Sequence, residues 1–125
     1  MNMDRFQAQQ EFWSSFGIPA YDARTVDYNA EMPYITYDAV SSNIGAVKDV
    51  NASLWYRSTS WAEISQKAIE ISRKVYEMPP SWEIDGGRIK FRVPEVSTFA
   101  QRGSDPDPNV RKMIITVEVE FLTAY

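Results

Sequence analysis

The segment from Asp105 to Asn109 resembles the start of a calcium-binding loop, because Asp105, Asp107 and Asn109 follow a D-x-D-x-N spacing. Such a loop requires a glycine at its sixth position and a glutamate at its twelfth. The sequence has Val110 and Thr116 there instead. We therefore expect no calcium site in this segment, and no other pattern in the sequence predicts a metal or a cofactor.

Groups suited to catalysis are scarce. The sequence contains no histidine and no cysteine, which removes the commonest general base and the thiolate nucleophile. Asp and Glu are numerous, 17 together, but none is paired within an apolar segment in the way that acid–base catalysis favours. These features predict a protein that is not an enzyme.

The basic and aromatic residues allow a different class of function, in which the protein is a small module that binds a nucleic acid or another ligand. Tyrosines and tryptophans interleave with Arg57, Arg88 and Arg92, as on surfaces that bind single-stranded nucleic acid. The net charge of -4 argues against a broad phosphate-binding face. Gly86-Gly87 is followed by neither a helix nor the lysine of a phosphate-binding loop, so it predicts a hairpin turn.

Length and composition predict one globular domain over residues 1–125. Hydrophobic residues make up 44% and charged residues 24% of the 125 positions, which allows a core without disulfides. No apolar stretch approaches the roughly 20 residues that span a bilayer, and the first residues do not read as a signal peptide. We expect synthesis in the cytoplasm and no membrane anchor.

The first predicted helix covers residues 3–16. Asp4 is its expected N-cap, and Gly17 ends it. One face of this helix is expected to carry Phe6, Gln9, Gln10, Trp13 and Phe16. The aromatic cluster Phe12-Trp13-Phe16 either docks on the core or forms an arm that binds a neighbouring subunit.

The second predicted helix covers residues 60–78. A capping box formed by Ser60 and Glu63 is expected to begin it, and Pro79-Pro80 ends it. Its apolar residues repeat at spacings of three and four, so we expect it to bury one side, made of Trp61, Ile64, Ala68, Ile71 and Val75.

Strands are predicted at residues 33–40 and 50–58, as an antiparallel hairpin, and at 82–93, as a second hairpin about Gly86-Gly87. A long, central strand is predicted at 111–125. The stretches 18–32 and 94–109 are expected to be loops, the second exposed or ordered by a partner. The predicted fold class is α+β, with a small antiparallel sheet of about four to five strands and two helices on one face.

Charges on the outward side of the sheet form two rows of opposite sign. Arg88, Lys90 and Arg92 form a basic row, and Glu118 and Glu120 form an acidic one. If these strands are neighbours, the rows complement each other. They then make ion pairs on a solvated face, or they contact another subunit.

Several segments together resemble the tail terminator and tail completion proteins of tailed phages and prophages of Gram-positive bacteria, also described as minor capsid or head–tail joining proteins. The resemblance is collinear over nearly the whole chain. Its segments are residues 12–21 (FWSSFGIPAY), 33–37 (PYITY), 54–61 (LWYRSTSW), 84–87 (IDGG), 99–102 (FAQR) and 117–121 (VEVEF).

This resemblance implies a non-enzymatic virion protein, assembled in the bacterial cytoplasm, whose subunits form a ring, usually of six. Such a ring ends the tail tube and joins it to the head connector, and DNA passes through without specific binding. A head-side stopper or connector adaptor is the alternative role. Residues proposed to contact subunits or partners are Trp55, Arg57, Gly86, Gly87, Arg88, Lys90, Arg92, Phe99, Gln101, Arg102, Asp105 and Asp107.

Overall fold

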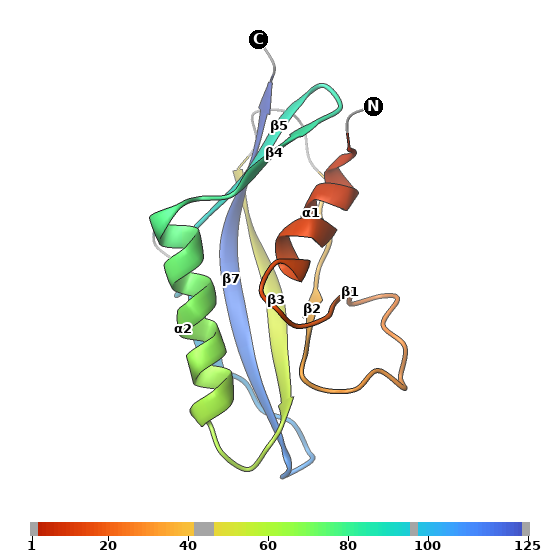
Figure 1. Ribbon diagram of the computed structural model, residues 1–125, viewed down its shortest axis with the longest axis vertical. Coiled ribbons are helices and arrows are strands. Elements are labelled where there is room, and N and C mark those ends of the chain that lie inside the picture. The colour runs from red at the N-terminus through yellow and green to blue at the C-terminus, as the bar shows by residue number, and fades with distance from the viewer. Residues whose placement is uncertain (1–2, 42–46, 96–97, 124–125) are drawn as a thin grey trace.

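The computed structural model describes residues 3–41, 47–95 and 98–123. Two helices, α1 (Arg5–Ser14) and α2 (Ala62–Glu77), pack on one face of a seven-stranded sheet (Figure 1). The α+β class and the placement of the helices are therefore as predicted. The strands are β1 (Ala20–Asp22), β2 (Tyr34–Tyr37), β3 (Val47–Arg57), β4 (Ser81–Ile84), β5 (Gly87–Arg92), β6 (Ala100–Arg102) and β7 (Val110–Thr123).

The sheet is larger than predicted, and it is mixed rather than antiparallel. Its strand order is β1-β2-β3-β7-β5-β4, and β6 pairs with β7 beside β5. β1 runs parallel to β2, whereas the other pairs are antiparallel. The two strands that the sequence did not predict, β1 and β6, lie in the expected loops. Each has three residues, which is too short to show an alternating pattern.

The centre of the sheet is the pair formed by β3 and β7, as the length of the last strand predicted. The pairing runs from Val47↔Glu120 to Arg57↔Val110. β3 begins before the predicted boundary at 50, because its first three residues, Val47 to Asp49, are all exposed and gave no alternating strand pattern. Residues 124 and 125, the end of the predicted last strand, lie outside the described part.

Helix α1 holds the two halves of the sheet together. Phe12 stacks on Phe91 of β5 with ring centroids 4.0 Å apart, and Trp13 stacks on Tyr37 of β2 at 6.1 Å. The helix therefore contacts strands on both sides of the central pair, and the sheet curls around it. The aromatic cluster belongs to the chain's own core and is not an arm for a neighbouring subunit, because Phe12 and Trp13 are fully buried and Phe16 is nearly so.

Two details of α1 differ from the prediction. Phe6 is 49% exposed and Gln10 is also exposed, because the buried face turns toward Ala8, Gln9, Phe12 and Trp13. Gln9 is fully buried, and its amide exchanges hydrogen bonds of 2.7 and 2.8 Å with the backbone of Val40. The predicted N-cap is confirmed, because the Asp4 side chain accepts from the amides of Phe6 and Gln7.

Helix α2 buries four residues of its predicted stripe, Ile64, Ala68, Ile71 and Val75, whereas Trp61 precedes the helix and is half-buried. The predicted capping box is wrong. Trp61 occupies the N-cap position, and no side chain caps the helix. The Ser60 hydroxyl instead accepts a 3.0 Å hydrogen bond from the amide of Ala62, two residues on. A serine can satisfy a nearby amide in a turn as well as at a helix N-cap, so the motif alone did not fix the first residue of the helix.

We predict that Phe12→Ala lowers the free energy of unfolding by about 3–5 kcal/mol, because the ring is fully buried and stacked on Phe91. Urea denaturation measures this change. Phe6→Ala is the matched control on the same helix and should change stability by less than about 1 kcal/mol, since the ring is 49% exposed. Equal losses in the two variants would contradict this account of the core.

Candidate interaction surface

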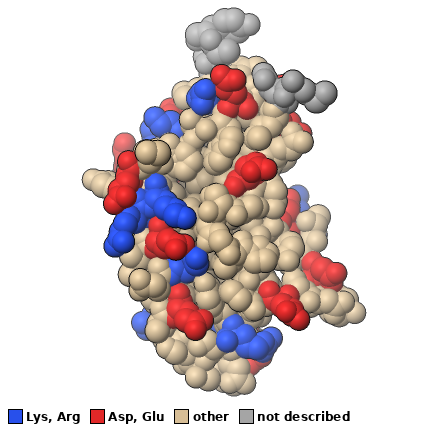
Figure 2. Space-filling view, viewed as in Figure 1, with Lys and Arg blue, Asp and Glu red and all other residues tan. Residues whose placement is uncertain are grey.

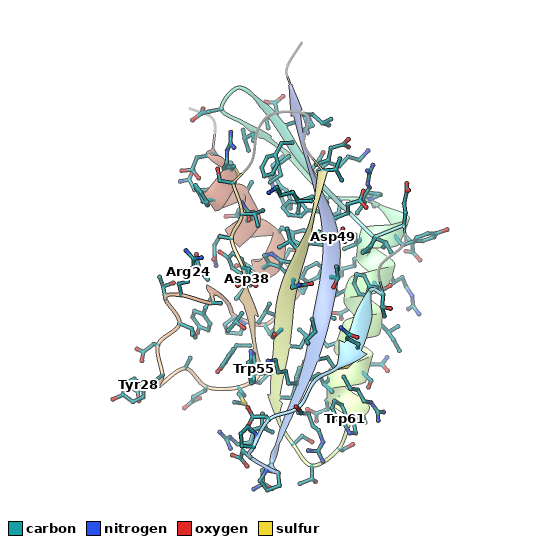
Figure 3. All side chains as sticks on the ribbon, turned by 180° about the vertical axis from the view of Figure 1, so that it is seen from behind. Arg24, Tyr28, Asp38, Asp49, Trp55 and Trp61 are labelled. Carbon is teal, nitrogen blue, oxygen red and sulfur yellow. The ribbon has the colours of Figure 1, made fainter. Side chains whose placement is uncertain are left out.

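The face of the sheet opposite the helices is here called the outer face. Along β3 it carries Trp55 toward one end and Asp49 toward the other (Figure 3). Strand alternation places Trp55 on this face, beside Tyr34 of β2 and Lys112 of β7. The inward residues of the same strands form the buried core with the helices. The outer face is therefore where β2, β3 and β7 offer side chains to solvent or to a partner.

The aromatic end is ordered by contacts within the chain. The Trp55 indole nitrogen donates a 2.9 Å hydrogen bond to the Thr36 hydroxyl, and the Lys112 ammonium lies 4.7 Å from the centre of the ring. Tyr34 lies between Trp55 and Tyr21, with centroid distances of 6.4 and 5.7 Å. The result is a half-buried band of packed rings in which the Trp55 indole N–H is already bonded.

The predicted basic and acidic rows do lie on adjacent strands, and they join through Arg92. Its Nε donates a 2.6 Å hydrogen bond to Glu118, and its guanidinium lies 3.5 Å from Glu120. Glu118 accepts this bond while only 9% exposed. Hydrogen bonding to the Glu118 carboxylate raises the pKa of the Arg92 guanidinium above its ordinary value.

The other members of the basic row have different surroundings. Arg88 contacts Glu83 at 3.4 Å and donates to the Ser81 hydroxyl at 3.0 Å, both on β4. Lys90 lies opposite Glu120 in the register of β5 and β7. The hairpin is confirmed, but its two turn residues are Asp85 and Gly86 and not the predicted Gly86-Gly87 pair. Gly86 has a φ of +85°, which a glycine adopts without strain. This tip, with Gly87 beginning β5, lies at one end of the molecule (Figure 1).

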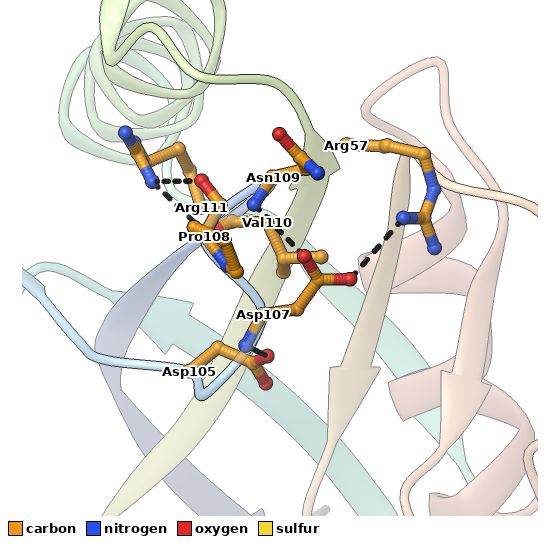
Figure 4. A network of polar contacts seen from close by, with 7 residues as sticks. All are labelled: Arg57, Asp105, Asp107, Pro108, Asn109, Val110 and Arg111. Carbon is orange, nitrogen blue, oxygen red and sulfur yellow. Dashed lines mark hydrogen bonds and ion pairs between the residues drawn. The ribbon is translucent and has the colours of Figure 1, made fainter.

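The loop before β7 is ordered by its own polar groups (Figure 4). Oxygens of Asp105 and Asp107 each accept a 2.9 Å hydrogen bond from a backbone amide two residues further on. Asp107 also contacts Arg57 at 3.5 Å, and the Ser58 amide donates to the Asn109 carbonyl at 2.8 Å. Contacts within the chain therefore order this part of the loop, and of the two predicted alternatives, exposed or ordered by a partner, its mostly exposed residues fit the first.

These bonds also explain the resemblance to a calcium loop. Aspartate and asparagine at alternate positions accept bonds from nearby amides in turns. Over residues 3–41, 47–95 and 98–123, no group of three or more histidine, cysteine, aspartate or glutamate side chains is arranged to hold a metal ion.

No helix of the described chain is both long and apolar enough to cross a membrane.

Two of the proposed contact residues, Phe99 and Arg102, lie at the edge of the sheet beside α2, away from the outer face. The Arg102 guanidinium carbon lies 4.5 Å from the Trp61 ring centre, and that of Arg111 lies 5.3 Å from it. Gln101, between them on β6, is exposed and points to the other side. The twelve proposed residues therefore do not form one site, because they divide among the outer face, the loop before β7, the hairpin tip and this edge.

A groove between α2 and β6, which the sequence did not predict, lies beside Phe99. Its volume is about 710 Å³, and the residues along it include Ile69, Tyr76, Phe99, Ala100 and Met113. Ile69 and Tyr76 are 51% and 76% exposed. They are large apolar or aromatic side chains on the polar side of α2. Their position in the helical pattern was the feature of the sequence that could have indicated this groove.

Comparison with solved structures finds a similar chain in the virion of a native gene transfer agent particle. The TM-score is 0.59, the sequences are 16% identical, and the match covers 90% of this chain and 88% of that one. At this identity the match shows a shared fold. No protein-family model matches the sequence, and no curated protein matches it.

We predict that Arg92→Ala lowers the free energy of unfolding by about 1–3 kcal/mol, because it leaves the Glu118 carboxylate nearly buried without its charged donor. Urea denaturation again gives the measurement. Arg88→Ala on the same strand is the control, and we expect a change below about 1 kcal/mol because both partners of its ion pair are exposed. A larger loss from Arg88→Ala would overturn this ranking.

Proposed function

We propose that this protein is a structural subunit of a phage-like particle, and that copies of it form a ring which ends the tail tube and joins it to the head connector. The observation that carries the proposal is the fold shared with a chain of a gene transfer agent virion, over 90% of this chain. The resemblance of the sequence to tail terminator and tail completion proteins supports the same role.

The use of the polar side chains is consistent with a structural role. Arg92, Glu118, Asp107 and Lys67 are bonded within the chain. These bonds fix strands and loops in place, and they do not converge on a pocket where a substrate could react.

The long axis of the molecule offers two separate contact regions for a joining protein. β5 pairs with the end of β7 near Thr123, whereas the loop at Asp105–Asn109 precedes the start of β7 at Val110. The hairpin tip and this loop therefore lie at opposite ends of the molecule (Figure 1). In a ring whose subunits stand along the tail axis, one end would contact the tail tube and the other the connector.

Negative-stain imaging of the purified protein, alone and mixed with tail tubes, tests the proposal. We expect rings, or tubes closed by a ring at one end. Monomers that leave both ends of every tube bare would show that the proposal is wrong.

Two matched variants test the assignment of the ends. Replacing residues 104–108 by a Gly-Ser linker of equal length should spare the fold and abolish binding to one partner, the tube or the connector. Arg88→Ala at the hairpin should weaken binding to the other partner. If both variants lose the same partner in pull-down experiments, the arrangement of the two ends is wrong.

A further inference from the structure

The loop between β1 and β2 presents one almost completely exposed aromatic side chain. Tyr28 is 94% exposed, and it lies at the far side of the loop from the sheet (Figure 3). Backbone amides of Arg24 and Asn29 donate to the side chains of Asp22 and Asp27 at 3.0 and 2.9 Å. The Ala23 amide donates to the Tyr37 carbonyl at 2.9 Å. Tyr28 is thus held on an ordered projection.

An exposed tyrosine on an ordered loop is suited to binding. Tyrosine buries a large area with little loss of side-chain entropy, and it is enriched among the residues that dominate interfaces. Because the loop is already ordered, little backbone entropy is lost when it binds.

The groove between α2 and β6 lies on the opposite side of the molecule from this loop. α2 and the loop between β1 and β2 lie on opposite lateral sides in Figure 1, and α2 and Tyr28 do so in Figure 3. The groove is mainly apolar, and the exposed side chains of Ile69 and Tyr76 border it. β6, at its base, is paired only with β7 among the described strands.

Charges favour contact between these two sides. Asp27 and Glu31 flank Tyr28, and neither forms an ion pair within residues 3–41, 47–95 and 98–123. Arg73 lines the groove and makes no ion pair in the same part of the chain. Asp and Glu appear on the side of the loop, whereas along the α2 side Lys and Arg are mixed with Asp and Glu (Figure 2).

We propose that the loop carrying Tyr28 inserts into the α2–β6 groove of a second copy of this chain. The proposal rests on the ring proposed above and names the surfaces that form it. The Tyr28 ring packs against Ile69 and Tyr76 of the next copy, and Asp27 or Glu31 faces its Arg73. Because the two surfaces are different and lie on opposite sides, each copy uses one with each neighbour. Such head-to-tail contacts form a ring when the rotation from copy to copy closes.

Disulfide cross-linking tests this contact directly, because the chain has no cysteine of its own. Tyr28→Cys protein mixed with Ile69→Cys protein should give a cross-linked dimer under mild oxidation. The matched control mixes Tyr28→Cys with Met78→Cys, since Met78 is 79% exposed at the end of the same helix but does not line the groove. We expect about tenfold or more cross-linked dimer from the Ile69 mixture than from the control.

A second test uses no cysteine. Tyr28→Ser and Ile69→Glu should each weaken self-association by about tenfold or more, measured by analytical ultracentrifugation. Mixing the two variants should restore dimers, because one intact loop can then meet one intact groove. Circular dichroism of each variant shows that the fold is retained.

The outcomes separate this contact from the ring itself. Rings or oligomers without preferential Tyr28–Ile69 cross-linking would overturn the contact and leave the proposed function standing. Protein that stays monomeric at every concentration, with no cross-link above the control, would also overturn the contact. The proposed function then depends on the imaging with tail tubes.

Discussion

The pairing of β3 with β7 is the interaction on which the other parts of this fold depend. The two longest strands pair along the whole of β3, and every other element is placed relative to them. β2 extends the sheet from β3, and β5 and β6 share the opposite edge of β7. Since alternate residues of each strand face opposite sides, this pair also decides which side chains enter the core and which reach the outer face.

Burial on one side of the sheet has a further consequence. α1 stacks Phe12 on β5 and Trp13 on β2, so the sheet must curl toward that helix. α2 fills the remaining area, and the Lys67 ammonium donates a 2.9 Å hydrogen bond to the carbonyl of Phe16, just after α1. The helices and the inner face of the sheet thus form one core, and the outer face, the two ends and the lateral edges remain for contacts with other molecules.

Several side chains on the outer face are bonded within the chain, whereas large ones on the two lateral sides are exposed to solvent. The Arg92–Glu118 pair and the Trp55–Thr36 hydrogen bond hold their side chains in place on the outer face without a partner. Tyr28 and the groove beside α2 lack comparable contacts, since their large side chains stand in solvent. Exposed aromatic and apolar groups of this kind on an ordered framework are typical of sites that bind another protein, which is why we place the subunit contact there and not at the charged rows.

The sequence alone determined the elements that carry a long periodic pattern. The stripe of α2, the core face of β7 and the hairpin at Gly86 follow from spacing and turn chemistry. Alternation places the basic and acidic rows on the same face, and the structure added that their strands are neighbours. The sequence also showed that histidine and cysteine are absent, so that neither an imidazole nor a thiolate is available to a metal or to catalysis. Only the tertiary structure decided the short strands β1 and β6, the first residue of α2 and the ordering of the loop before β7. These features depend on contacts with residues distant in the chain, such as Tyr37 for Ala23 and Arg57 for Asp107. The residues near a segment in sequence do not indicate which distant group will contact it. For the same reason, the separation of the candidate residues onto different surfaces became visible only in three dimensions.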